Sequence, residues 1–189
     1  MKKLVATSLI TLTLVTGCVP VAMVASATAG GAVIYDNRDA TTMNADQNAR
    51  EYAQRWLDSD PVLKGHSKIT VSVFNRVALL AGQAQTVEIR NRAYEIVKRV
   101  KNIKRIYNEI TIAGSVGTMQ EMSDSWITTK VRSALLSKSA LKSNNIKVVT
   151  EGGVVFLMGS ISRKQATLAV DAARRVKGVK KVIKVFEYQ

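Results

Sequence analysis

Few residues in this 189-residue sequence belong to the types that catalyse reactions or bind metals. There is one cysteine, Cys18, and one histidine, His66. Structural zinc sites use clusters of Cys and His, and hydrolytic sites pair a nucleophile with a base, so neither chemistry is favoured. His66 stands beside Gly65 and Ser67 in a polar segment typical of a surface loop. We therefore expect no enzymatic activity, no metal and no cofactor, and Cys18 needs its own explanation.

Cys18 ends the first hydrophobic segment of the chain. Lys2 and Lys3 provide a short basic start, an uncharged run of 13 residues follows at 4–16, and small residues precede the cysteine. This order predicts a secretory signal peptide at residues 1–17. The sequence Val15-Thr16-Gly17-Cys18 also resembles the bacterial lipobox. That resemblance implies lipidation of the Cys18 thiol, cleavage before Cys18 and acylation of its new amine.

An uncleaved membrane anchor is the alternative for this segment, because no charged residue occurs at 4–35. Gly17, Pro20 and the pair Gly30-Gly31 interrupt the stretch, which favours the cleaved lipoprotein. Val19 follows the cysteine, in place of the aspartate that resembles an inner-membrane retention signal. The lipoprotein resemblance thus implies the periplasmic face of the outer membrane. Residues 18–45, rich in Ala, Gly, Thr and Val, predict a lipidated N-terminus and flexible tether.

The chain is strongly basic, with a formal net charge of +14. Residues 121–189 hold 13 Lys/Arg against 5 Asp/Glu, and residues 46–114 hold 12 against 7. Such an excess favours anionic lipid headgroups, nucleic acid or an acidic polymer as partners. Nucleic acid is disfavoured, because the signal peptide directs the chain out of the cytoplasm and no usual recognition helix is evident. The densest basic region, for which a solvated face is the plainest explanation, contains Arg174, Arg175, Lys177, Lys180, Lys181 and Lys184.

Two copies of one unit occupy the rest of the sequence, with a period of about 77 residues. The segment ITVSVFNRVALLAG at 69–82 corresponds to IKVVTEGGVVFLMG at 146–159. Further on, VKNIKRI at 100–106 corresponds to VKGVKKV at 176–182. The repeat predicts two domains, at 46–114 and 123–189, joined by a linker at 115–122.

Each copy is predicted to start with an amphipathic helix. In the first copy the apolar residues Ala49, Tyr52, Ala53, Trp56 and Leu57 recur at helical spacing. This pattern predicts one buried face, so Trp56 is expected to be structural.

Two strands, a second helix and a last strand are predicted to follow. Short turns at 75–76 and 152–153 predict β-hairpins with strands at 69–74, 77–82, 146–150 and 154–159. The second helix is predicted at 87–100 and, in the second copy, after Ser162, whose spacing to Gln165 fits a capping box. The last strands are predicted at 105–112 and 181–188. A helical crossover makes each last strand parallel to a hairpin strand, which predicts an α+β fold with a three-stranded mixed sheet and two helices on one face.

This order of elements, with V-V-F-L-x-G at 154–159 and R-V-x-G-V-K-x-V at 175–182, resembles the BON domain of bacterial envelope proteins. The signal peptide, the lipobox and two such domains together resemble the dual BON-domain outer-membrane lipoproteins. The resemblance implies a non-enzymatic protein that binds anionic phospholipid such as phosphatidylglycerol or cardiolipin. It also implies support of outer-membrane integrity and enrichment at the division site. The first copy has Asn102 where the pattern has glycine, so its role is left open.

The first helix of the second copy is the predicted membrane site. At about 100° per residue, Ile127, Val131, Ala134 and Leu135 form its core side. Trp126 and Leu136 lie on another face beside basic residues, as in helices that bind membrane interfaces. The predicted phospholipid-binding residues are Trp126, Ile127, Thr129, Lys130, Arg132, Ser133, Leu136, Ser137 and Lys138.

Two other interpretations are left open. Trp126 is structural if it packs against the other domain or the linker at 115–123. The whole chain is a periplasmic adaptor if its second domain docks on an envelope or cell-wall protein.

Overall fold

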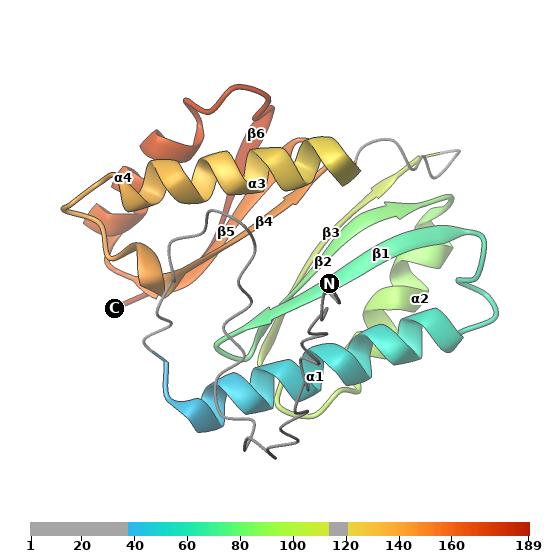
Figure 1. The fold of residues 1–189 in the computed structure, drawn as a ribbon. Helices are drawn as coiled ribbons and strands as arrows, with labels where there is room; N and C mark the ends of the chain where they lie inside the picture. Colours follow the sequence, from blue (N-terminus) through green and yellow to red (C-terminus); the bar gives the residue numbers. More distant parts are fainter. Residues whose placement is uncertain (1–37, 114–120) are drawn as a thin grey trace, which may run out of the picture. The chain divides into compact units, whose positions relative to one another are not determined.

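The computed structural model describes residues 38–113 and 121–189 (Figure 1). The predicted signal peptide, Cys18, most of the predicted tether and most of the predicted linker lie outside the described residues. Within the two described ranges, no helix is both long enough and apolar enough to cross a bilayer.

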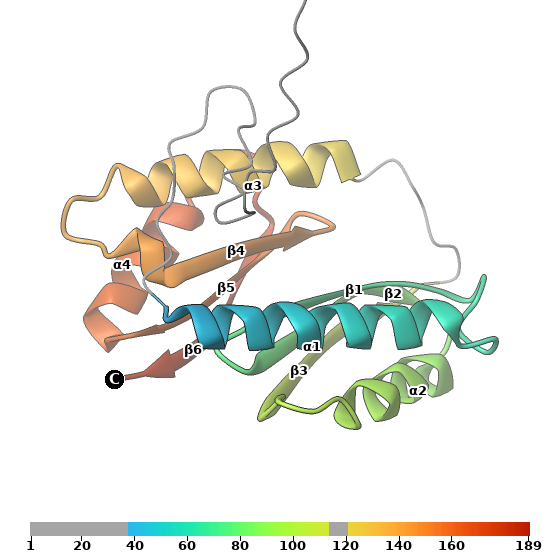
Figure 2. The same cartoon turned by 60° about the horizontal axis from the view of Figure 1, so that its bottom comes forward.

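The first copy contains α1 (Ala40–Ser59), β1 (Ser67–Phe74), β2 (Val77–Ala84), α2 (Val87–Lys98) and β3 (Arg105–Ile112). Strand β1 pairs antiparallel with β2, and β2 pairs parallel with β3. Helices α1 and α2 lie beside one another and contribute to the same hydrophobic cluster as Val71, Val73 and Leu80 (Figure 2). Both helices therefore cover one face of this sheet.

The second copy repeats this arrangement. It contains α3 (Glu121–Leu136), the short 3-10 helix η1 (Ser143–Asn145), β4 (Ile146–Glu151), β5 (Val154–Ile161), α4 (Arg163–Ala173) and β6 (Lys181–Tyr188). Strand β5 is central, antiparallel to β4 and parallel to β6. The predicted α+β fold, with a mixed three-stranded sheet in each copy, is confirmed.

Side-chain caps set the start of three of these helices. Asp39 caps α1 through the backbone N–H of Thr42, at 2.8 Å, so residues 40–45 are helical and their assignment to a flexible tether is wrong. Thr86 caps α2 and Ser162 caps α4. The Gln165 side chain, predicted to complete a capping box, instead donates to the carbonyl of Ala140 and accepts from the backbone of Lys142. A long-range contact has replaced the local one.

The buried side of α1 is narrower than the sequence predicts. Ala49, Ala53 and Leu57 are buried, whereas Tyr52 and Trp56 are 52% and 44% exposed. The prediction that Trp56 lies in the core is therefore wrong. The three buried apolar residues are spaced four apart. At about 100° per residue, Tyr52 and Trp56 lie at the edge of the stripe that these buried residues form.

The sheet faces that the helices leave uncovered are also apolar and buried. A third hydrophobic cluster contains residues of both sheets, and it comprises Phe74, Val77, Leu79, Ala81, Phe156, Met158 and Val185. Because successive strand residues point to opposite faces, β2 and β5 are buried on both sides. This explains why both strands are nearly continuous apolar runs. The described residues of both copies, 38–113 and 121–189, belong to one compact unit.

Candidate membrane-binding site

Helix α3 separates a packed side from an exposed side. Ile127, Val131 and Leu135 are each at most 2% exposed, while Trp126 and Leu136 are 48% and 39% exposed. Packing against the described part of the chain therefore leaves about half of the Trp126 side chain accessible. Ile127 is enclosed in the core, so its assignment to the lipid-contacting set is wrong. Trp126 and Leu136, the two large apolar side chains on the outer side, do not pack into a hydrophobic core of the described residues.

The exposed arc of α3 contains most of the residues predicted for the site. The exposed residues of this set on the helix are Trp126, Thr129, Lys130, Arg132, Ser133 and Leu136. Ser137 and Lys138 are exposed just beyond its end. The Lys130 amine lies 5.6 Å from the centroid of the Trp126 ring. This cation–π arrangement holds a charge directly beside the indole.

Two hydroxyl groups on this arc are already satisfied within the helix. The Thr129 hydroxyl donates to the carbonyl of Ser125 at 3.0 Å, and the Ser137 hydroxyl donates to the carbonyl of Ala134 at 2.9 Å. These groups need no partner from water when the surface around them is dehydrated. The arc is thus less polar than its composition suggests.

A buried carboxylate fixes the start of α3 on the sheet. Asp124 is 7% exposed and accepts hydrogen bonds from the backbone N–H groups of Gly152 and Gly153, at 2.7 and 2.8 Å. These glycines form the β4–β5 turn and have φ values of 61° and 81°. The residue two positions before Trp126 is therefore held by a turn about 28 residues further along the chain. Sequence reasoning missed Asp124, although Asp46 in the first copy is its equivalent.

Both copies of the repeat match one known domain family. A family model described as "BON domain" matches residues 45–114 and 123–189. The chain belongs to the BON-domain family. The predicted pair of BON domains is confirmed, and α3 is the first helix of the second one.

Two curated relatives match most of this BON protein. The "Outer membrane lipoprotein DolP" of Haemophilus influenzae is 32% identical over 172 residues, covering 91% of this chain and 89% of that protein. The "21 kDa hemolysin" of Actinobacillus pleuropneumoniae is 40% identical over 153 residues, covering 81% of this chain and 79% of that protein. Among solved structures, CdsD of the Chlamydia trachomatis type III secretion system is 17% identical with a TM-score of 0.29, and the match covers 76% of this chain and 63% of that chain. Nothing about function follows from a likeness that weak.

The two flanks of α3 have different surroundings. On one flank the Thr128 hydroxyl donates to the Thr150 hydroxyl of β4, at 2.7 Å. Arg132 lies on the same flank, where it helps to line a polar cavity of about 510 Å³ with Thr70 and Glu151. On the other flank, Gly178 of the α4–β6 loop approaches Ile127. Trp126 and Lys130 lie toward this second flank, so Arg132 is separated from them.

Lys147 of β4 has the most strongly shifted pKa among the described residues. Its amine donates to the Val73 carbonyl at 3.2 Å. Its pKa is lowered to about 8, mainly by burial. The positive charges of Arg50, Arg38 and Arg132 contribute to this decrease, and Asp46 opposes it. No sequence pattern predicts this burial, because nothing local distinguishes Lys147 from an exposed strand lysine.

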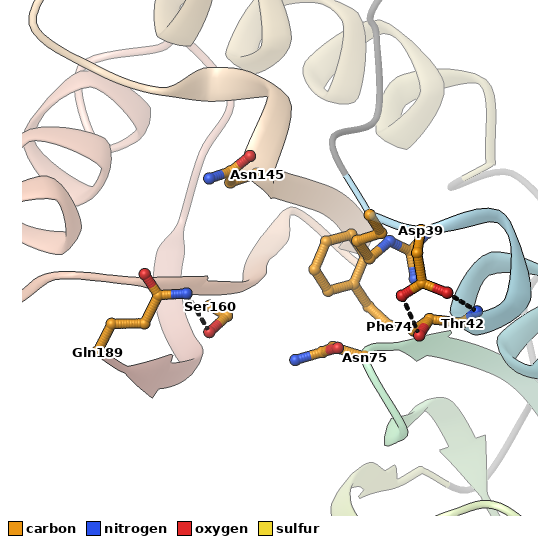
Figure 3. Close-up of a pocket in the computed structure, with 8 residues that line it drawn as sticks. Asp39, Thr42, Phe74, Asn75, Asn145, Ser160 and Gln189 are labelled. Carbon is orange, nitrogen blue, oxygen red and sulfur yellow. Dashed lines mark hydrogen bonds between the residues drawn. The ribbon is translucent and has the colours of Figure 1, made fainter.

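The described part of the chain offers little catalytic chemistry. It contains no group of three or more His, Cys, Asp or Glu side chains able to hold a metal. Arg38 and Asp39 help to line a cavity of about 280 Å³. Figure 3 shows Asp39 among the lining residues, beside Thr42. Asp39 accepts from the backbone and the hydroxyl of Thr42, which hold its pKa below the ordinary value. The carboxylate is thus engaged in capping α1.

Proposed function

We propose that this protein is a non-enzymatic lipoprotein of the outer membrane, anchored through Cys18 on the periplasmic side. Its second BON domain binds anionic phospholipid through α3, and the protein supports envelope integrity. The observation that carries the lipid-binding step is the exposed Trp126 with Lys130 stacked beside it. Two findings support the anchoring step: the lipobox-like sequence before Cys18, and the similarity to a Haemophilus influenzae protein named as an outer membrane lipoprotein.

Two physical contributions differ in kind at such a site. Basic side chains near an anionic bilayer contribute about 1 kcal/mol each, and salt screens them over about 10 Å. An indole at the headgroup boundary adds a contribution that salt hardly affects and that fixes the depth of the helix. Trp126 and Lys130 therefore supply depth and charge selectivity respectively.

Weak contacts are sufficient if the chain is acylated. Acyl chains on Cys18 would confine the second BON domain to the membrane surface, so its own binding occurs at high local concentration. Lipid composition then decides where on the membrane the domain settles. On this basis we also propose enrichment at the division site, which the lipoprotein resemblance implies to be rich in anionic lipid.

Vesicle flotation of protein without residues 1–18 tests the proposal free of the acyl anchor. We expect the wild type to float with vesicles that contain phosphatidylglycerol and not with vesicles of phosphatidylcholine alone. Trp126→Glu should abolish flotation. Trp56→Glu is the matched control, because Trp56 is equally exposed but lies in the first domain.

Two outcomes would overturn lipid binding by α3. Trp126→Glu protein that floats as well as the wild type would remove α3 as the site. Wild-type protein that fails to float with anionic vesicles would favour the adaptor interpretation, with the second domain docking on an envelope protein.

A further inference from the structure

The α4–β6 loop and its borders form the most basic surface of the second BON domain. Six cations occur between residues 174 and 184, and all six side chains are exposed. They are Arg174, Arg175, Lys177, Lys180, Lys181 and Lys184. The nearby acidic residue, Asp171, is paired with Arg174 at 3.0 Å.

Several of these cations have local structural roles. Arg174 and Arg175 follow the end of α4, where positive charge stabilises the helix dipole. The Lys180 amine donates to the Gly152 carbonyl at 3.0 Å. By contrast, the side chains of Lys177 and Lys181 form no hydrogen bond or ion pair with other residues that the structure describes. Their exposed charges are not needed to hold this loop.

Close packing places the loop against α3. Gly178 has a φ of 94°, and a Cβ atom added there would lie 3.1 Å from the Cδ1 atom of Ile127. Glycine permits both the left-handed backbone and the close approach. The loop lies beside the middle of α3, as the red segment that leads into β6 shows (Figure 1). Lys177 is therefore within one residue of the contact with the candidate membrane helix.

The loop lies on the same flank of α3 as the exposed indole. At about 100° per residue, Lys130 is about 60° from Ile127, and Trp126 is about 40° beyond Lys130. Thr128 points the opposite way, where its hydroxyl bonds to Thr150 of β4. Lys130 and Trp126 therefore lie on the flank of α3 that borders the basic loop, and Thr128 lies on the flank that borders β4.

We propose that Lys177 and Lys181, supported by Arg175, form a phosphate-binding extension of the α3 surface. The partner is the headgroup layer of an anionic phospholipid bilayer, so this inference rests on the proposed function. Charge complementarity favours a phosphate-rich partner, and the indole on the same flank favours a bilayer over a soluble polyanion. Trp126 sets the depth, and the loop lysines supply much of the anion selectivity.

The first BON domain provides a matched control. Its α2–β3 loop is also basic, with Lys101 and Arg105 at the positions of Lys177 and Lys181 and with Asn102, at a φ of 68°, in place of Gly178. Its helix α1 has Asn48 at the position of Trp126. Neutralising either pair removes the same net charge, but only one pair lies beside the exposed Trp126.

The test compares Lys177→Gln/Lys181→Gln with Lys101→Gln/Arg105→Gln in protein lacking residues 1–18. Binding to phosphatidylglycerol vesicles is measured over a range of salt concentrations, with circular dichroism to confirm folding. Each lysine near an anionic surface is expected to strengthen binding about fivefold, so substituting both loop lysines should weaken binding about 25-fold at low salt. The difference should shrink at high salt, and the control pair should change binding by less than about twofold.

Three results would overturn the inference. Equal losses from both pairs would show a general effect of net charge. Unchanged vesicle binding in the loop variant, with Trp126→Glu still defective, would refute the loop site while leaving α3 as the membrane site. A loop variant that loses binding to an oligonucleotide but keeps vesicle binding would assign the cations to a soluble polyanion instead.

Discussion

Asp46 and Asp124 make the same contact in the two BON domains. Each carboxylate lies on the first helix of its domain and accepts hydrogen bonds from two backbone N–H groups of the hairpin turn. Asp46 accepts from Asn75 and Arg76, at 2.6 and 2.8 Å. Asp124 accepts from Gly152 and Gly153, at 2.7 and 2.8 Å. Asp46 is also paired with Arg38. In both domains, one buried charge ties the first helix to the turn.

Removing this tie should destabilise the domain. Asp124→Ala leaves two backbone N–H groups without their acceptor, and charge-assisted hydrogen bonds contribute about 1.5–3 kcal/mol each. We expect a loss of about 2–4 kcal/mol in the free energy of unfolding, measured by urea titration of the chain without residues 1–18. Ser125→Ala, at the exposed neighbour, should change it little. A loss below about 0.5 kcal/mol would show that water replaces the carboxylate.

The hairpin turn of the first domain holds a non-glycine residue in the left-handed backbone conformation, whereas the turn of the second domain has glycine there. Arg76 has a φ of 66°, whereas its counterpart Gly153 has a φ of 81° and no side chain to strain. Arg76→Gly should therefore raise the free energy of unfolding by about 1 kcal/mol. Gly153→Ala should lower it by a similar amount. Thermal melts of the two variants check the pair, and a drop in the melting temperature of Arg76→Gly would contradict the argument.

Two equivalent strand glycines should tolerate no side chain. A Cβ atom at Gly159 would lie 2.4 Å from the carbonyl oxygen of Asn145, and one at Gly82 would lie 2.1 Å from that of Lys68. Gly159 of β5 pairs with Ile146 of β4, so close approach of the two backbones leaves no room for a side chain. Gly159→Ala should lower the melting temperature by several degrees. If the variant is still folded, its binding to anionic vesicles should persist, and wild-type stability would refute the clash.

Stability should depend on pH through Lys147. Its pKa falls from 10.5 in the unfolded chain to about 8 in the folded protein, so folding disfavours the charged amine. The penalty is complete below pH 8 and is relieved as the pH rises from about 8 to 10.5. Lys147→Met should therefore gain on the wild type by up to about 3 kcal/mol at pH 7, less the lost bond to Val73, and this advantage should shrink by pH 10.

Urea titrations at several pH values measure this difference. Lys142→Met, which changes an exposed lysine near Lys147, is the control and should give a pH-independent difference. A constant difference between wild type and Lys147→Met from pH 7 to pH 10 would mean that Lys147 is not desolvated.

Cys18 lies outside the described residues, and its role is tested by substitution. Cys18→Ala should prevent acylation, because the thiol is the atom that the lipobox resemblance assigns to the diacyl group. Mass spectrometry of membrane fractions should find unprocessed or mislocalised protein. Acylated Cys18→Ala protein in the outer membrane would refute the assignment.

The sequence determined the features that depend on local spacing. The repeat of about 77 residues, the hairpins and the exposed position of Trp126 opposite the Val131 side of α3 all follow from the order of residues within one element. Turn residues and helical periodicity are local properties, so the chain predicts them without its tertiary contacts.

Only the tertiary structure decided which residues meet across the chain. Gly178 contacts Ile127, about 50 residues away in the sequence. Asp124 accepts a hydrogen bond from the turn at Gly152. Lys147 is desolvated and donates to the carbonyl of Val73. Tyr52 and Trp56 have helical spacing and yet lie at the surface, because the width of the sheet-facing stripe depends on what packs against it. Burial and electrostatic environment arise from close packing of distant segments, which no local pattern of residue types records.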